Sequence, residues 1–240
     1  MSVSFDTSVE SHTGITGSVS EDFFDILITP SASVKGLLVF TLVNADADDA
    51  LSVKINPSGA NVDVPAVSGG RAIDNLGEPG DCKTWFLGSG LPAGGAEWTV
   101  RINRNNNANV MWAVAITVIA NNNTEVYTPG IVLLEGDQAL SEQNVDDGSP
   151  GTDSLRFAGV NFGGGAVQTA GANSTVLQDI DFGARIDSVV RENTAGQGSR
   201  PVGWTAAGSD DTAAVFLAVK ESAVAEGGVP FFTTIGAKRI

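Results

Sequence analysis

Short apolar runs with alternating polarity recur along the chain, separated by clusters of Gly, Asn, Asp, Ser and Pro. Two clear examples are Val110 to Ile119 (VMWAVAITVI) and Ala213 to Lys220 (AAVFLAVK). Runs of this length, bounded by turn-forming residues, are typical of β-strands. No window of a dozen residues keeps apolar positions at helical spacing without an intervening Gly or Pro. The pattern therefore predicts an all-β protein with few or no helices.

Each sheet of such a protein must bury one apolar face, so the sequence predicts an antiparallel, jelly-roll-like β-sandwich of two sheets and about fourteen strands. Gly36 to Asn44 (GLLVFTLVN) is almost continuously apolar and is predicted to be a central strand buried on both faces. Residues 1–20 are read as an N-terminal arm or edge strand, 21–222 as the sandwich and 223–240 as a C-terminal tail or arm. Within the sandwich, the acidic stretch from Gly136 to Thr152 is predicted to be a mobile surface loop.

The charge balance is strongly acidic, with 13 Lys and Arg against 28 Asp and Glu and a formal net charge of −15. The basic residues are scattered, whereas a nucleic-acid backbone needs a basic stripe, so direct nucleic-acid binding is not expected. No apolar run reaches the ~18–20 residues that span a bilayer, and no secretory signal is recognised. The single Cys82 cannot form an internal disulfide and fits a reducing cytoplasm.

Side chains that commonly perform catalysis are scarce, since the chain has one His, one Cys and one Tyr. His12 lies in a Ser- and Thr-rich stretch and is read as a surface residue, because a catalytic His needs an orienting partner and burial. Cys82 has no His near it in the sequence, so it is read as a buried or half-buried structural thiol. We therefore expect a protein that is not an enzyme and that has no cofactor.

Carboxylates supply the one enzymatic alternative. Asp179 and Asp181 alternate on one predicted strand and so point to the same face, as a glycan-cleaving pair would require. Sugar clefts are usually lined with aromatic residues, and this chain has only four Trp. All four lie in strand patterns and are predicted to be core residues: Trp85, Trp98, Trp112 and Trp204.

Acidic clusters in predicted loops make calcium the alternative to having no cofactor. Their carboxylates could supply hard oxygen ligands, although none follows the spacing of a helix–loop–helix calcium site. The simpler interpretation is that they are solvated turn residues. The clusters are Asp46, Asp48 and Asp49; Asp146 and Asp147; and Asp210 and Asp211.

Several segments together resemble virion-associated β-sandwich proteins encoded by tailed phages. The resemblance covers most of residues 20 to 222 and is carried by structural motifs, so it transfers no catalytic residue. The segments are Gly36 to Val43, KTWFLGSGLPAGGAEWTVRI (Lys83 to Ile102), SLRFAGVNFGGG (Ser154 to Gly165), SVVRE (Ser188 to Glu192), VGWT (Val202 to Thr205) and SDDTAAVFLAVKES (Ser209 to Ser222).

The resemblance implies a virion structural part assembled in the host cytoplasm, most simply a capsid decoration (cement) protein. Its expected partners are the major capsid protein, other virion proteins and further copies of itself. The alternative is a receptor- or carbohydrate-binding module of a tail or head fibre. Chain ends could grip neighbours by adding to a sheet edge and burying apolar anchors. The candidate partner-binding residues in the C-terminal segment are Val229, Phe231, Phe232, Lys238 and Arg239.

Overall fold

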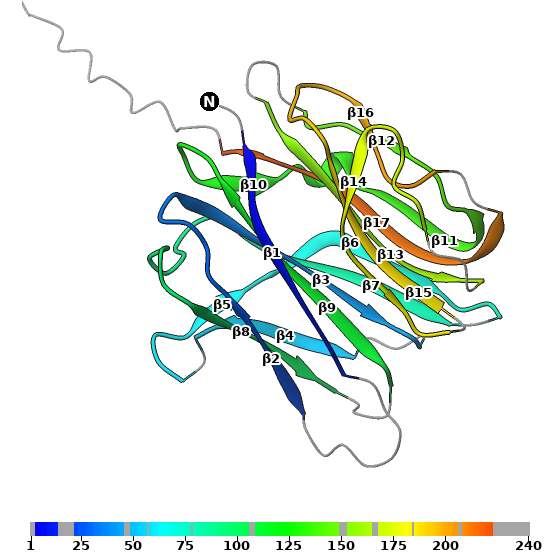
Figure 1. Cartoon of the computed structure of the whole chain (residues 1–240), viewed down its shortest axis with the longest axis horizontal. Helices are drawn as coiled ribbons and strands as arrows, with labels where there is room; N and C mark the ends of the chain where they lie inside the picture. The colour runs from blue at the N-terminus through cyan, green and yellow to red at the C-terminus, as the bar shows by residue number, and fades with distance from the viewer. Residues whose placement is uncertain are drawn as a thin grey trace, which may run out of the picture.

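The computed structural model describes residues 3–13, 22–45, 49–56, 58–77, 79–105, 109–148, 153–164, 168–183, 185–205 and 208–222 (Figure 1). Their strands are numbered β1 to β17, and all of the strand pairings are antiparallel. The prediction of an all-β sandwich is confirmed. In the part of the chain that the structure describes, no helix is long and apolar enough to cross a membrane.

The first half of the chain, residues 4–119, folds as a jelly roll that we call the N-terminal roll. Its inner sheet has the order β1-β9-β3-β7-β6 and its outer sheet the order β2-β8-β4-β5. The other eight strands, without β6, pair as in a jelly roll: β1 beside β9, β2 beside β8, β3 beside β7 and β4 beside β5. The strands are β1 (Ser4–Thr13), β2 (Phe23–Ile28), β3 (Val34–Val43), β4 (Ala50–Ile55), β5 (Val62–Val64), β6 (Ala66–Asp74), β7 (Gly80–Leu87), β8 (Trp98–Arg104) and β9 (Met111–Ile119).

The second half, residues 124–221, repeats much of this order and is called the C-terminal roll. Its inner sheet runs β11-β17-β13-β15-β14, with β10 on the same edge of β17 as β11, and its outer sheet is the pair β12-β16. Among the described residues of this roll no strand corresponds to β4 or β5; a single bridge between Ala170 and Trp204 stands in their place. The elements are β10 (Thr124–Val126), η1 (Thr128–Gly130), β11 (Val132–Ala139), β12 (Gln143–Val145), β13 (Leu155–Gly163), β14 (Ser174–Asp181), β15 (Arg185–Glu192), β16 (Arg200–Val202) and β17 (Ser209–Glu221).

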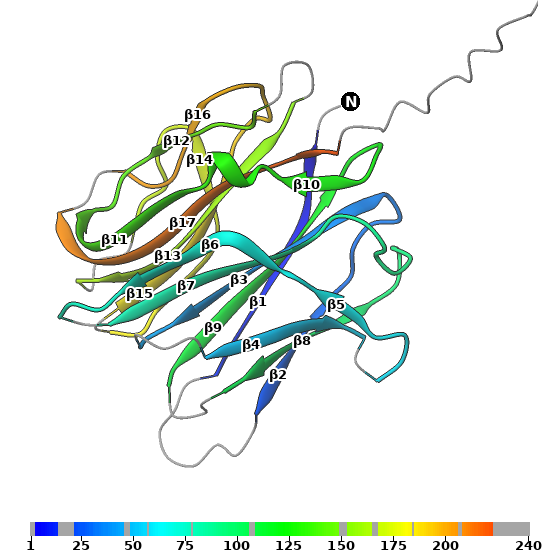
Figure 2. The ribbon, with the colours of Figure 1, turned by 180° about the vertical axis from the view of Figure 1, so that it is seen from behind.

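The two rolls lie back to back, so four layers follow one another: outer, inner, inner, outer (Figure 2). Each roll has its own apolar core between its two sheets, and a third core, which we call the seam, lies between the two inner sheets. β9 shows how one strand serves two cores. Trp112 and Val114 face the seam, whereas Met111 and Ala113 face the core of the N-terminal roll.

Two apolar cores on either side of an inner sheet explain the continuous apolar runs. The predicted burial of both faces at Gly36 to Asn44 is confirmed for β3, of which eight consecutive residues from Gly36 to Val43 are buried. The architecture differs from the predicted pair of sheets because buried inner strands need a layer on each side. The prediction of a mobile loop over Gly136 to Thr152 is wrong for its described part, since β12 forms there and Asp147 is fully buried.

Candidate functional site

Both ends of the described chain lie at one end of the molecule, which we call the terminal pole. Ser4 at the start of β1 pairs with Ile119, and Glu221 at the end of β17 pairs with Thr124, so they flank the same short turn. The Asn121 N–H donates to Oε1 of Glu221 (2.9 Å), and the Ser222 N–H donates to the Asn123 carbonyl (2.8 Å). Figures 1 and 2 both show the start of β1 beside the end of β17. Any segment continuing from either end therefore begins at this pole.

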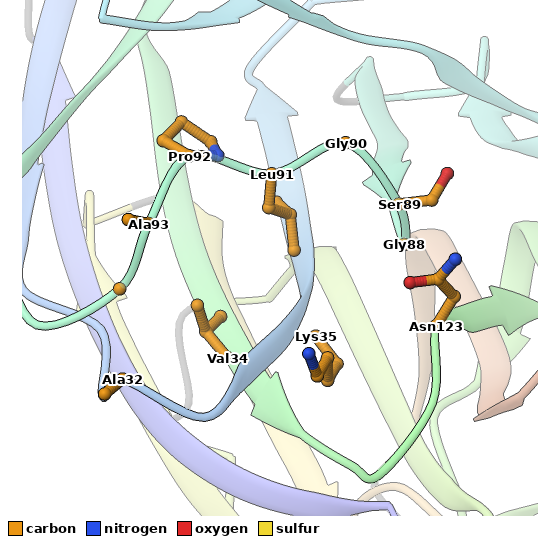
Figure 3. Close-up of a pocket in the computed structure, with 11 residues that line it drawn as sticks. Ala32, Val34, Lys35, Gly88, Ser89, Gly90, Leu91, Pro92, Ala93 and Asn123 are labelled. Atoms are coloured by element: carbon orange, nitrogen blue, oxygen red, sulfur yellow. The ribbon is translucent and has the colours of Figure 1, made fainter.

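A polar pocket of about 250 Å³ opens at the terminal pole (Figure 3). It is formed by the β2–β3 connection, the glycine-rich β7–β8 connection from Gly88 to Gly94, and Asn123 of the β9–β10 turn. The glycine at position 88 is required by close packing, because a Cβ there would lie 1.7 Å from the Thr124 carbonyl oxygen. The pocket is thus built from loops that pack tightly on one another.

The lining of this pocket offers hydrogen-bonding groups beside short apolar side chains. Lys35, Ser89 and Asn123 contribute an ammonium, a hydroxyl and an amide, and Figure 3 shows Leu91 directed inward between them. Lys35 makes no ion pair with a described residue, and the Thr124 hydroxyl anchors its backbone by donating to the Lys35 carbonyl (2.7 Å). None of the eleven lining residues is a carboxylate or a histidine. Such a site can bind a polar group but brings no acid–base pair to it.

The most extensive buried ionic network lies inside the C-terminal roll around Arg156. This guanidinium is fully buried and reaches Oε2 of Glu192 (3.0 Å) and Oδ2 of Asp147 (3.3 Å). It also donates to the carbonyls of Val145 (2.9 Å) and Gly196 (3.0 Å). Arg200 donates to the other oxygen of Glu192 from the outside. Because each charge is paired and hydrogen-bonded, the network fixes the position of β12 on β13 and β15.

A second buried polar cluster crosses the seam. The Asn161 amide on β13 donates to Oδ1 of Asp187 on β15 (2.6 Å) and to Oδ1 of Asn44 beyond the end of β3 (2.5 Å). Arg185 donates to the Asn161 side-chain oxygen. Oδ2 of Asp187 has no hydrogen-bond partner among the residues that the structure describes. Burial raises the pKa of Asp187 to about 8, although the Asn161 hydrogen bond and the Arg185 charge both oppose the shift.

The residues considered for catalysis lie apart. Cys82 is fully buried at the seam, donates its S–H to the Gly159 carbonyl (3.4 Å), and has a raised pKa because of burial first and the nearby Asp81 and Asp187 second. The predicted burial of this thiol is therefore confirmed. His12 lies in β1 opposite Trp112, and the structure describes only its backbone.

The paired carboxylates of the enzymatic alternative sit on the exposed edge strand β14. Asp181 accepts a hydrogen bond from the Gly183 N–H (2.6 Å) and so shapes the following turn. The pKa of Asp179 is raised by desolvation, with smaller contributions from Asp181 and Glu10. Neither residue is among those lining the pocket at the terminal pole.

The four Trp side chains lie in the cores, and several residues of the acidic clusters make hydrogen bonds within the fold. The prediction that all four Trp are core residues is confirmed, with exposures between 0% and 4%. Asp147 belongs to the Arg156 network, and Asp49 accepts a hydrogen bond from the Asn109 amide. Asp210 accepts from the following N–H of Asp211 (2.8 Å). Within the described ranges no group of three His, Cys, Asp or Glu side chains could hold a metal ion.

Sequence reasoning missed both buried polar clusters. The signals were present as single charged residues inside otherwise apolar strands, Arg156 in LRFAGVNF and Glu192 in SVVRE. The candidate partner-binding residues Val229, Phe231, Phe232, Lys238 and Arg239, like Asp46 and Asp48, lie outside the described residues. Comparison with known proteins finds no family model, no curated protein and no solved structure that matches this chain.

Proposed function

We propose that this chain is a non-enzymatic structural protein of a virion, a capsid decoration protein that binds the major capsid protein and stabilises the shell. The observation that carries the proposal is the terminal pole, where the first and last described strands emerge side by side. A decoration protein needs a rigid body and a defined attachment end. The back-to-back rolls supply the body, and the start of β1 and the end of β17 lie together on one side of it.

Attachment is assigned to the segments that continue from this pole. The C-terminal segment combines the adjacent Phe231 and Phe232 with the basic pair Lys238 and Arg239, in a chain whose net charge is −15. Aromatic side chains supply apolar anchors at protein interfaces, and a basic pair suits the acidic surface of a neighbouring protein. The neighbours in such a shell are the capsid protein and further copies of this chain. The resemblance to phage virion proteins over residues 20 to 222 points the same way.

A second candidate function is favoured by the pocket at the terminal pole. The Lys35 ammonium, the Ser89 hydroxyl and the Asn123 amide line one pocket, and a few such polar groups commonly orient small ligands in protein pockets. A receptor- or carbohydrate-binding module would use such a pocket at its exposed tip. The two candidates differ in copy number, since a decoration protein covers the shell whereas a fibre module is present in few copies.

Deletion of residues 223–240 tests the proposal. Purified virions should contain the full-length chain in a simple ratio to the major capsid protein, measured by quantitative gel densitometry. The truncated chain should keep the melting temperature of the isolated protein, because the three described apolar cores lie within residues 3–222. When added back to stripped capsids it should occupy fewer sites and raise their melting temperature less. Full occupancy after truncation would contradict the role of the C-terminal segment, and a few copies per particle would favour the fibre module.

A further inference from the structure

An exposed edge strand can pair with another chain, and proteins usually prevent this with bulges, charged residues or very short strands. Most described edge strands of this molecule are protected in one of these ways. The register shifts in β1 between Phe5 and Thr7, and in β14 between Val176 and Gln178. The β6 register also shifts where it pairs with β7, and β5, β10, β12 and β16 have only three residues each. Two longer edge strands pair in an unbroken register, β11 with β17 and β2 with β8. Of these, β11 carries the exposed carboxylates Glu135 and Asp137 and a glycine at positive φ, Gly136, whereas β2 has neither a glycine nor two acidic residues.

The free edge of β2 presents both backbone groups and apolar side chains. The Arg104 N–H donates to the Asp22 carbonyl (2.7 Å), so Asp22 and Arg104 are a hydrogen-bonded pair of the antiparallel β2–β8 ladder. Hydrogen-bonded pairs alternate along such a ladder, so Phe24, Ile26 and Ile28 are the β2 residues whose backbone groups bond to β8. The N–H and C=O groups of Phe23, Asp25 and Leu27 point away from β8, and no described strand pairs with them, although β1 contacts β2 without forming a ladder with it. The side chains of Phe23 and Leu27 are 37% and 53% exposed on the outer face.

The charge on β2 is already neutralised within the sheet. Asp25 receives two hydrogen bonds from the Arg101 guanidinium (2.8 and 2.7 Å), which also lies 3.7 Å from the centre of the Phe23 ring. Within β2 itself no unpaired carboxylate therefore remains to repel an incoming strand. A symmetric pairing of two β2 strands about Asp25 would still place two carboxylates opposite each other, which is unfavourable. The edge is better suited to a strand without acidic residues.

We propose that β2 is a β-augmentation site whose occupant is the C-terminal segment 229–235 of a second copy of this chain. This segment (VPFFTTI) has no charged residue, is rich in residues that favour strands, and has its one proline near the start. In an added strand Phe231 and Phe232 face opposite sides of the sheet. One ring covers the exposed face beside Phe23 and Leu27, and the other lies against the edge of the core near Phe24. The proposal rests on the proposed function, because it identifies a second copy of this chain as the binding partner of the C-terminal segment.

This contact joins two different surfaces, an edge on one copy and a segment on the next. Such heterologous contacts produce open chains or closed rings of copies. Each copy then carries one acceptor edge and one donor segment, and the shell would be decorated by linked copies. Association of this kind does not require a capsid, so it can be measured with the purified chain alone.

Sedimentation velocity of the full-length chain over a wide concentration range tests the proposal. The average mass should rise with concentration. Leu27→Lys places a charge on the acceptor edge, and F231S/F232S removes the anchors from the donor segment; each should weaken association about tenfold or more. Leu51→Lys is the matched control, because Leu51 is 56% exposed on β4 of the same outer sheet but does not lie on the β2 edge. It should associate like the unaltered chain, and thermal melts should show that all variants are folded.

Mixing the two defective variants gives the sharpest result. The Leu27→Lys chain keeps its donor segment and the F231S/F232S chain keeps its β2 edge, so the mixture should form a one-to-one complex that neither variant forms alone. A full-length chain that stays monomeric, an equal loss with Leu51→Lys, or a mixture that does not associate would each overturn the β2 proposal. None of these outcomes bears on whether the chain attaches to capsids, which the add-back experiment measures separately.

Discussion

The two rolls share a strand order but close their outer layers by different means. The N-terminal roll covers its inner sheet with a four-stranded outer sheet and a core made of apolar side chains around Trp98. In the described part of the C-terminal roll the outer layer is the short pair β12-β16, and beside its apolar core this roll holds the Arg156 network. The difference shows that a roll with fewer strands can be closed by a buried ionic network that ties loops to strands. Three substitutions probe this contrast, from the largest expected effect to the smallest.

Arg156→Met should be the most damaging, because it leaves the buried carboxylates of Asp147 and Glu192 without their shared cation. Removing one partner of a buried ion pair destabilises a protein by about 3–5 kcal/mol. Chemical denaturation monitored by Trp fluorescence should show this loss. Adding Asp147→Asn and Glu192→Gln to the Met variant should restore part of the stability, since no charge then remains buried. A loss below about 1 kcal/mol would mean that the network does not hold the C-terminal roll closed.

Asp187→Asn should have an intermediate effect that depends on pH. The pKa of Asp187 is raised to about 8 in the folded chain from its ordinary 3.8, so the folded state holds an extra proton between these values. The unfolding free energy therefore falls as pH rises from about 4 to about 8. The Asn variant lacks this dependence and should be more stable than the unaltered chain at pH 9, by on the order of a few kcal/mol. Melting temperatures of both proteins across this range provide the measurement, and parallel curves would exclude Asp187 as the cause.

Arg101→Ala should have the smallest effect, although Arg101 also pairs with a carboxylate. Its partner Asp25 and Arg101 itself lie on the solvent face of the outer sheet, 31% and 24% exposed. Exposed ion pairs contribute about 0–1 kcal/mol because water screens them. Denaturation in low and high salt should show a loss within this range that shrinks as salt is added. A loss approaching that of Arg156→Met would mean that burial does not explain the contrast between the two rolls.

Sequence patterns predicted the apolar inner strands well, because those strands carry the strongest signal. Gly36 to Asn44 and Ala213 to Lys220 were expected to be buried strands, and they form much of β3 and β17. The division into two rolls was not predicted, although each half of the chain ends on a long buried strand. Alternation shows that a residue is buried but not which of two cores it faces, so one sandwich and two stacked sandwiches give the same pattern.

The weaker elements were harder to predict for physical reasons. β12 (QNV) has two polar residues and one buried apolar residue, too few to show a strand pattern. Its pairing with β16 is supported by the contacts of Asp147 and Arg156, which lie nine residues apart in the sequence. The pocket at the terminal pole is made by three loops, and its shape depends on close contacts such as that of Gly88 with Thr124. The position of a loop depends on such tertiary contacts, which leave no periodic signal. The candidate partner-binding residues stay a prediction.

The double-sided burial of β9 also limits how the chain can change in length. A deletion of one residue before Trp112 would turn its indole into the space shaped for Met111 and bring small side chains such as Ala113 to the seam, because a one-residue slip reverses every side chain of a strand. The N-terminal roll and its contact with the C-terminal roll would be disrupted together. Insertions and deletions should therefore be tolerated only in connections between strands, and homologues of this chain should differ in length there.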